Sequence, residues 1–129
     1  GGMPAFSESV PSYVKYNGVK IKEFPINTLS FLNKKIIYSG GGYFRLMPYK
    51  FIKYYSSKSK YIMTYFHPRD FDEHQPVIKD LNLLRKFKSY VGLRGAMKKL
   101  NKWANDVCFV DLGTADKIIN WEEAPIVNL

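Results

Sequence analysis

Tyr61-Ile62-Met63-Thr64-Tyr65-Phe66, followed directly by His67-Pro68, is the stretch that decides the predicted fold. A near-continuous apolar run of this length is typical of a strand buried on both faces. Pro68 has no backbone N–H to donate to a sheet, so the strand is expected to end sharply at His67. Cys108 to Leu112 has the same apolar character and predicts a last buried strand.

Amphipathic segments separate these two runs and precede them. Leu93 to Ala104 is the clearest helix, because one stripe carries Leu93, Met97, Leu100 and Ala104. A second helix is expected to start near Met47, where Pro48 fits a first turn and the apolar positions Phe44, Met47, Phe51 and Tyr55 recur at helical spacing. Thr114 could cap a short helix through Ile119. Leu81 to Val91 is ambiguous between a helix and coil.

The N-terminal region predicts short strands. Tyr13 to Tyr16 and Val19 to Phe24 flank Asn17-Gly18, a favoured two-residue hairpin turn, and the second strand places Val19, Ile21 and Glu23 on one face. Asn27 to Leu32 and Lys35 to Tyr38 predict further extended pieces. Residues 1–3 resemble an added leader, and residues 4–11 an extended lead-in. Buried strands alternating with helices predict an α/β fold with partly parallel pairing.

Composition limits the partners without naming one. The 129 residues, 46% hydrophobic, predict one folded domain, and the net charge of +9 predicts attraction to nucleic acid, an acidic glycan, anionic lipid or another part of the same protein. The basic residues are scattered, which favours an ordinary solvated surface. No run is long and apolar enough to cross a membrane. The single cysteine, Cys108, excludes an internal disulfide and is expected to be buried.

Few residues are candidates for chemistry. The two histidines, His67 and His74, do not have zinc-site spacing. His67 lies where a predicted strand enters a loop, a common place for active-site residues and equally for a histidine of no special function. The triple glycine at 40–42 lacks the phosphate-loop pattern and predicts a tight turn with close backbone approach. The carboxylates Asp70, Asp72 and Glu73 could serve acid–base chemistry, although such clusters are usually only solvated.

Several motifs in order resemble one known family. They are Glu23-Phe24-Pro25-Ile26, Gly40 to Tyr49, Tyr65 to Asp72, Gln75-Pro76 and Phe87 to Leu93. Together, over about residues 9–112, they resemble the distal part of bacterial exopolysaccharide-associated polysaccharide deacetylases of the NodB-homology type, carbohydrate esterase family 4, which carry a C-terminal extension of unassigned function.

The resemblance implies the C-terminal portion of a distorted, incomplete β/α barrel plus a small α/β extension. Residues 4–70 would supply the closing strands and helix of the barrel, and residues 71–129 the extension packed on it. By the same resemblance His67 matches a late-strand histidine that acts as acid toward the leaving amine. Tyr43, Arg45 and Asp70 are implied as substrate-binding residues. An imidazole can supply a proton near neutral pH.

The family's metal-binding motifs lie earlier in such proteins and are not in this sequence. No metal ligand is therefore assigned in this chain, and a divalent metal, zinc by the resemblance, is expected only in the full-length protein. The chain alone is expected to be inactive, its partners being the N-terminal half of the same enzyme and a polysaccharide substrate. The resemblance implies a bacterial protein in the cytoplasm or associated with the cell envelope.

Two other functions stay open. One is a non-catalytic binding module for an acidic glycan or envelope partner, motivated by the charge of +9 and the many aromatic residues. The other is a nucleic-acid-binding domain, which the placement of most aromatics on apolar faces disfavours.

Overall fold

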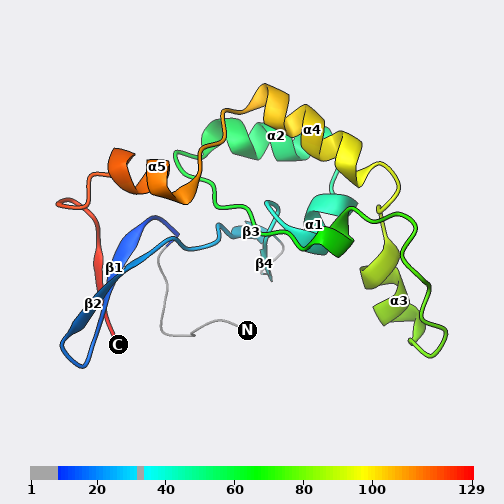
Figure 1. Cartoon of the computed structure of the whole chain (residues 1–129), viewed down its shortest axis with the longest axis horizontal. Coiled ribbons are helices and arrows are strands. Elements are labelled where there is room, and N and C mark those ends of the chain that lie inside the picture. Colours follow the sequence, from blue (N-terminus) through cyan, green and yellow to red (C-terminus); the bar gives the residue numbers. More distant parts are fainter. Residues whose placement is uncertain (1–8, 32–33) are drawn as a thin grey trace.

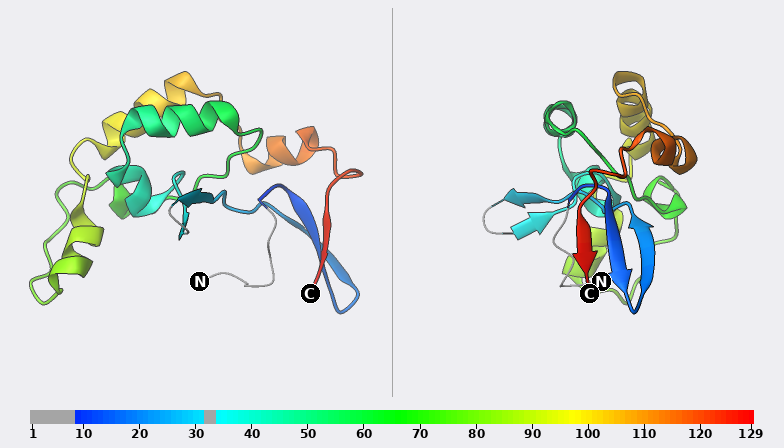
Figure 2. Two further views of the ribbon diagram at one scale, coloured as in Figure 1. Left: turned by 180° about the vertical axis from the view of Figure 1, so that it is seen from behind. Right: turned by 90° about the vertical axis from the view of Figure 1, so that its left-hand side faces the viewer.

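The computed structural model describes residues 9–31 and 34–129 and has an elongated, mixed α/β architecture (Figure 1). A small sheet lies at one end, helix α3 (Leu83–Tyr90) lies at the other, and helices α2 (Tyr49–Lys58) and α4 (Ala96–Asp106) lie side by side between them (Figure 2). The α/β class is confirmed. The barrel, the leader at 1–3, which lies outside the described residues, and the boundary after residue 70 stay predictions.

The predicted hairpin is confirmed. Strands β1 (Ser12–Tyr16) and β2 (Val19–Glu23) pair antiparallel, and the turn residues Asn17 and Gly18 both have the positive φ that a tight two-residue turn requires. Strand β5 (Ile126–Asn128) adds to the other edge of β1 in parallel. A separate two-stranded sheet joins β3 (Leu29–Phe31) to β4 (Lys34–Ile36).

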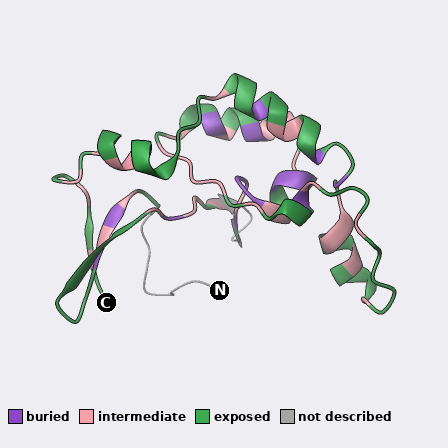
Figure 3. Ribbon diagram, viewed as in Figure 1, coloured by how far each residue is buried: buried purple, intermediate pink, exposed green. Residues whose placement is uncertain are grey.

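Four side chains that are fully excluded from solvent form the core: Tyr38, Phe44, Ile52 and Trp103. The ring of Phe44 stacks on Trp103 at 5.4 Å between centroids and meets the edge of Phe66 at 4.9 Å. The indole N–H of Trp103 donates to Ser56 at 2.9 Å, so its polar atom is satisfied inside the core. Residues on both sides of position 70 therefore share one core (Figure 3).

The helices follow the predicted segments with shifted ends. The Leu93–Ala104 segment becomes α4, which begins after Gly95 in the left-handed conformation. The helix expected to start near Met47 is confirmed as α2, with Pro48 as its N-cap. A separate short helix, α1 (Gly41–Leu46), precedes it and was not predicted. Proline suits the start of a helix and not its interior, so α1 and α2 do not join into one helix. The ambiguous Leu81–Val91 segment forms α3.

The prediction of a buried strand at Tyr61 to Phe66 is wrong. The segment is extended, but within residues 9–31 and 34–129 it makes only one parallel bridge, between Tyr65 and Gly40, and Tyr65 is 52% exposed. Side chains replace a neighbouring strand: the Asn27 amide donates to the Tyr61 carbonyl and accepts from the Met63 N–H. An asparagine amide carries both a donor and an acceptor, so it can satisfy such an edge locally.

The prediction of a second buried strand, at Cys108 to Leu112, is also wrong. Residues 108–111 have no regular secondary structure and are exposed, Cys108 included. Helix α5 (Leu112–Ile118) starts here, capped by Asp111, which accepts from the Thr114 N–H at 2.9 Å. Thr114 thus lies inside the first turn instead of capping it, because the carboxylate of Asp111 is the stronger acceptor for free helix N–H groups.

Among the described residues, no helix has both the length and the apolar character that a membrane crossing requires.

Candidate functional site

The backbone at Gly40 fixes the segment that leads to His67. A β-carbon at Gly40 would lie 2.3 Å from the carbonyl oxygen of Tyr65, so only glycine permits this approach. The Tyr65 N–H donates to the Ser39 carbonyl, and the Ser39 hydroxyl donates to the Met63 carbonyl at 2.8 Å. The close approach predicted for the glycine run is confirmed at this position.

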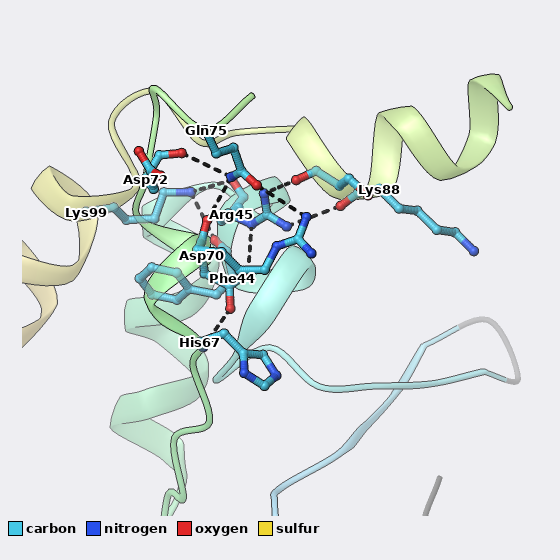
Figure 4. A network of polar contacts seen from close by, with 10 residues as sticks. Phe44, Arg45, His67, Asp70, Asp72, Gln75, Lys88 and Lys99 are labelled. Atoms are coloured by element: carbon cyan, nitrogen blue, oxygen red, sulfur yellow. Dashed lines mark hydrogen bonds and ion pairs between the residues drawn. The ribbon is translucent and has the colours of Figure 1, made fainter. Parts of the chain in front are cut away.

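A short turn then holds the His67 backbone. The single-turn helix η1 (Pro68–Asp70) follows His67, and the His67 N–H donates to the Asp70 carboxylate at 2.9 Å, while the Asp70 N–H donates back to the His67 carbonyl at 2.9 Å. The imidazole itself is exposed and points away from this network (Figure 4). Its ring meets the edge of the Tyr65 ring, with centroids 5.0 Å apart.

Asp70 is anchored in turn by Arg45 of α1. Both side chains are buried, and the Arg45 Nε lies 3.4 Å from Asp70 Oδ1. The two terminal nitrogens of Arg45 donate to the carbonyls of Ser89 and Lys88, the last turn of α3. Burial lowers the pKa of Arg45, and the Asp70 carboxylate opposes that shift. Arg45 therefore connects α1 to η1 through Asp70, and α1 to α3 through the last carbonyls of α3, which have no donor within that helix.

Lys99 of α4 completes the support. Its ammonium donates to three backbone carbonyls at the end of α1, those of Phe44, Arg45 and Met47, at 2.8–3.1 Å. Burial lowers the pKa of Lys99. A cation at a helix C-terminus is favourable because the last carbonyls lack intrahelical donors. Figure 4 shows Lys99, Arg45 and Asp70 as one continuous set of contacts beside His67.

The structure brings together three of the residues singled out from the sequence: His67 contacts Asp70, and Asp70 contacts Arg45. The carboxylate of Asp70 and the guanidinium of Arg45 are directed at each other and at backbone groups. Contact of either side chain with a substrate therefore stays a prediction. Tyr43 is 45% exposed and lies on a different surface, a pocket of about 370 Å³ between α1 and α3. Lys99 was missed by sequence reasoning.

No metal centre is evident in the described part of the chain. Within residues 9–31 and 34–129 no group of three His, Cys, Asp or Glu side chains could hold a metal ion, so these residues do not fit a zinc site by themselves. The side chain of His74 is 89% exposed and lies next to Glu73.

An apolar groove lies on another face of the molecule. It measures about 330 Å³ and is bordered by the extended segment, by residues 107–110 and by α5, so Cys108 lies on its wall. The polar side chains around His67 do not line it.

A protein-family model described as a domain of unknown function, DUF3473, matches residues 1–117, which include His67 and all of its supporting residues. No curated protein and no solved structure matches the chain. The match extends over nearly the whole sequence and continues across residue 70 without a break. The chain therefore belongs to the DUF3473 family.

Proposed function

We propose that this chain is the C-terminal part of a polysaccharide N-deacetylase, and that His67 gives a proton to the amine released when the N-acetyl group is hydrolysed. The proposal rests on the ordered motifs between about residues 9 and 112 that resemble such enzymes. One observation about the structure supports it most: the backbone of His67 is fixed on both sides while its imidazole stays free at the surface.

That arrangement suits a general acid. The Asp70 carboxylate is bound by the His67 backbone N–H and by Arg45, so it positions the residue without covering the ring. A proton donor must reach the leaving nitrogen within hydrogen-bond distance, which demands a defined position and an accessible nitrogen. The ring also lies against Tyr65, whose own backbone is held at Gly40.

Amide hydrolysis needs more than this proton. Collapse of the tetrahedral intermediate releases an amine, which the imidazolium would protonate, leaving acetate as the other product. Water must also be activated, and in the enzymes that this chain resembles a divalent metal supplies that chemistry. Because the described residues do not form a metal site, the proposal assigns that half of the reaction to the N-terminal half of the full-length protein.

The test joins this chain to a metal-binding deacetylase half and measures acetate release from N-acetylated glycans. His67→Ala should lower kcat by about 100-fold or more, the usual contribution of a positioned acid or base. His74→Ala is the matched control, because that histidine is exposed and outside the polar network, and it should leave the rate unchanged. An unchanged rate in the His67 variant would exclude the proposed role.

The second candidate is a non-catalytic module that binds an acidic glycan. The observation that favours it is a basic and aromatic surface on the sheet, where Lys20 lies 3.5 Å from the Tyr13 ring centroid and Lys22, which is also paired with Asp116, lies 4.8 Å from that of Trp121. If this candidate is right, the isolated chain should bind acidic polysaccharide, more weakly as salt rises, and Lys20→Gln with Lys22→Gln should weaken that binding. Loss of acetate release on His67→Ala would favour the first candidate instead.

A further inference from the structure

Helix α3 exposes an apolar face at the end of the molecule. None of its eight residues is buried, and Leu83, Leu84 and Phe87 are 87%, 64% and 54% exposed. In Figure 3 this helix is mostly exposed or partly exposed and projects away from the core. The neighbouring α1 leaves this face open, since Leu84 and Phe87 border the open pocket between the two helices. Leucine and phenylalanine at such exposures are unusual when they gather on one element.

The preceding loop enlarges that surface. The Ile78 N–H donates to the Tyr90 hydroxyl at 2.9 Å, and this hydroxyl donates to the Pro76 carbonyl at 3.0 Å. These bonds hold the loop beside the end of α3. Val77 and Ile78 are 56% and 52% exposed, so they add two more apolar side chains. We call Val77, Ile78, Leu83, Leu84 and Phe87 the α3 surface.

Basic residues flank the apolar face. At 3.6 residues per turn, Leu83, Leu84 and Phe87 share one side of the helix, Lys86 and Lys88 lie on its two borders, and Arg85 lies opposite. From residue 76 to residue 91 the basic side chains are Lys79, Arg85, Lys86 and Lys88, and the only acidic one is Asp80. An apolar face with basic borders is the pattern of helices that lie in the interface of an anionic membrane.

We propose that the α3 surface binds the surface of a membrane that contains anionic lipid. The apolar side chains would enter the boundary between headgroups and acyl chains, and Lys86 and Lys88 would remain at the level of the phosphates. The charge of the segment selects an anionic occupant, because an apolar protein partner or a second copy of this basic chain would gain nothing from the lysine borders, and the apolar face between those borders suits a lipid surface. The inference does not rest on the deacetylase proposal, but it requires that the N-terminal half proposed there leave the α3 surface uncovered.

Sedimentation with lipid vesicles tests this binding directly. The chain should sediment with vesicles of phosphatidylcholine mixed with phosphatidylglycerol, far less with phosphatidylcholine alone, and less at high salt. Phe87→Trp should give indole fluorescence that shifts to the blue on the mixed vesicles. Leu84→Ser with Phe87→Ser should abolish sedimentation while circular dichroism stays unchanged, because neither side chain is part of the core.

Two double lysine variants distinguish binding at the α3 surface from a general effect of the net positive charge. Lys86→Gln with Lys88→Gln should weaken partitioning about 25-fold, at about five-fold per charge. Lys98→Gln with Lys117→Gln, two exposed lysines on α4 and α5, makes the same change in net charge and should have a much smaller effect.

Three results would overturn the inference. They are equal binding to neutral vesicles, equal losses in the two lysine pairs, and a dimer in light scattering that Leu84→Ser with Phe87→Ser dissociates. The last result would mean that a second copy covers the α3 surface.

Discussion

The ammonium of Lys99 lies 2.8 Å from the backbone carbonyl oxygen of Arg45, and the guanidinium of the same Arg45 lies 3.4 Å from the carboxylate of Asp70. The backbone carbonyl of Arg45 thus accepts a hydrogen bond from Lys99 of α4, while the Arg45 side chain pairs with Asp70 of η1. The backbone of His67 is bound at the far end of this chain of contacts. Support for His67 therefore comes from a helix that begins nearly thirty residues later.

Replacing Lys99 tests the first contact. Lys99→Met keeps most of the aliphatic length but leaves three carbonyls of α1 without that donor. Hydrogen bonds to a charged group are worth about 1.5–3 kcal/mol, and partial exposure reduces this, so we expect a loss of about 1–2 kcal/mol in the free energy of unfolding.

Urea denaturation measures that loss. Lys98→Met is the control, because the neighbouring lysine is exposed and should change stability by less than about 0.5 kcal/mol. Equal effects of the two substitutions would show that the α1 contacts contribute nothing.

The Arg45–Asp70 pair should behave as a coupled unit. Removing one partner of a buried ion pair typically costs about 3–5 kcal/mol, because the other charge remains buried without compensation. Arg45→Leu and Asp70→Leu should each be strongly destabilising, and the double variant should lose clearly less than the sum of the two. Additive losses, measured by the same denaturation, would contradict direct coupling.

Local signals in the sequence predicted the elements that depend on local chemistry. Asn17-Gly18 specified the hairpin, because both turn positions need a positive φ. The apolar stripe of Leu93 to Ala104 predicted α4 to within three residues at its start and two at its end. The helical spacing and Pro48 predicted the start of α2 to within two residues, whereas the short α1 before it was not predicted.

The failures concern contacts between distant segments. An apolar run predicts burial, yet Tyr61 to Phe66 lies at an edge satisfied by Asn27, and Cys108 lies in an exposed connection. Nothing in the sequence distinguishes Lys99 from its neighbours Lys98 and Lys102, because its role depends on where the end of α1 lies. The motif resemblance implied His67, Arg45 and Asp70 as site residues, a role that stays a prediction, and their mutual arrangement came only with the structure.

Gly40 offers a test of the backbone approach. Gly40→Ala would place a methyl group 2.3 Å from the Tyr65 carbonyl oxygen, so the extended segment must move, at a cost of about 1–3 kcal/mol. Gly42→Ala is the control: its added methyl group would be 3.5 Å or more from neighbouring atoms, and alanine is the better helix former by about 1 kcal/mol. Thermal unfolding should therefore separate the two variants in opposite directions. Equal shifts of the unfolding temperature in the two variants would mean that the close approach of Gly40 to Tyr65 does not constrain the residue at position 40.

Tyr49, the first residue of α2, donates a hydrogen bond from its hydroxyl to the carboxylate of Asp106. Burial raises the pKa of Tyr49 to about 12, helped by the hydrogen bond from its hydroxyl to Asp106 and by the charge of that carboxylate. The ordinary value is 10.0, so the folded state holds the proton more tightly than the unfolded state. The resulting stabilisation is complete below pH 10 and is lost as the pH rises from 10 toward 12.

Spectrophotometric titration of tyrosinate should show this late ionisation. Tyr49→Phe should remove one late-titrating group and make stability less steeply pH-dependent between pH 10 and 12. Asp106→Asn should lower the pKa of Tyr49 but leave it above 10, because burial is the larger cause and remains. Tyr61, whose pKa burial also raises to about 12, serves as the internal reference in every variant. If the late titration of the Tyr49→Phe protein matches that of the unchanged chain, the Tyr49–Asp106 bond does not hold the phenol proton in solution.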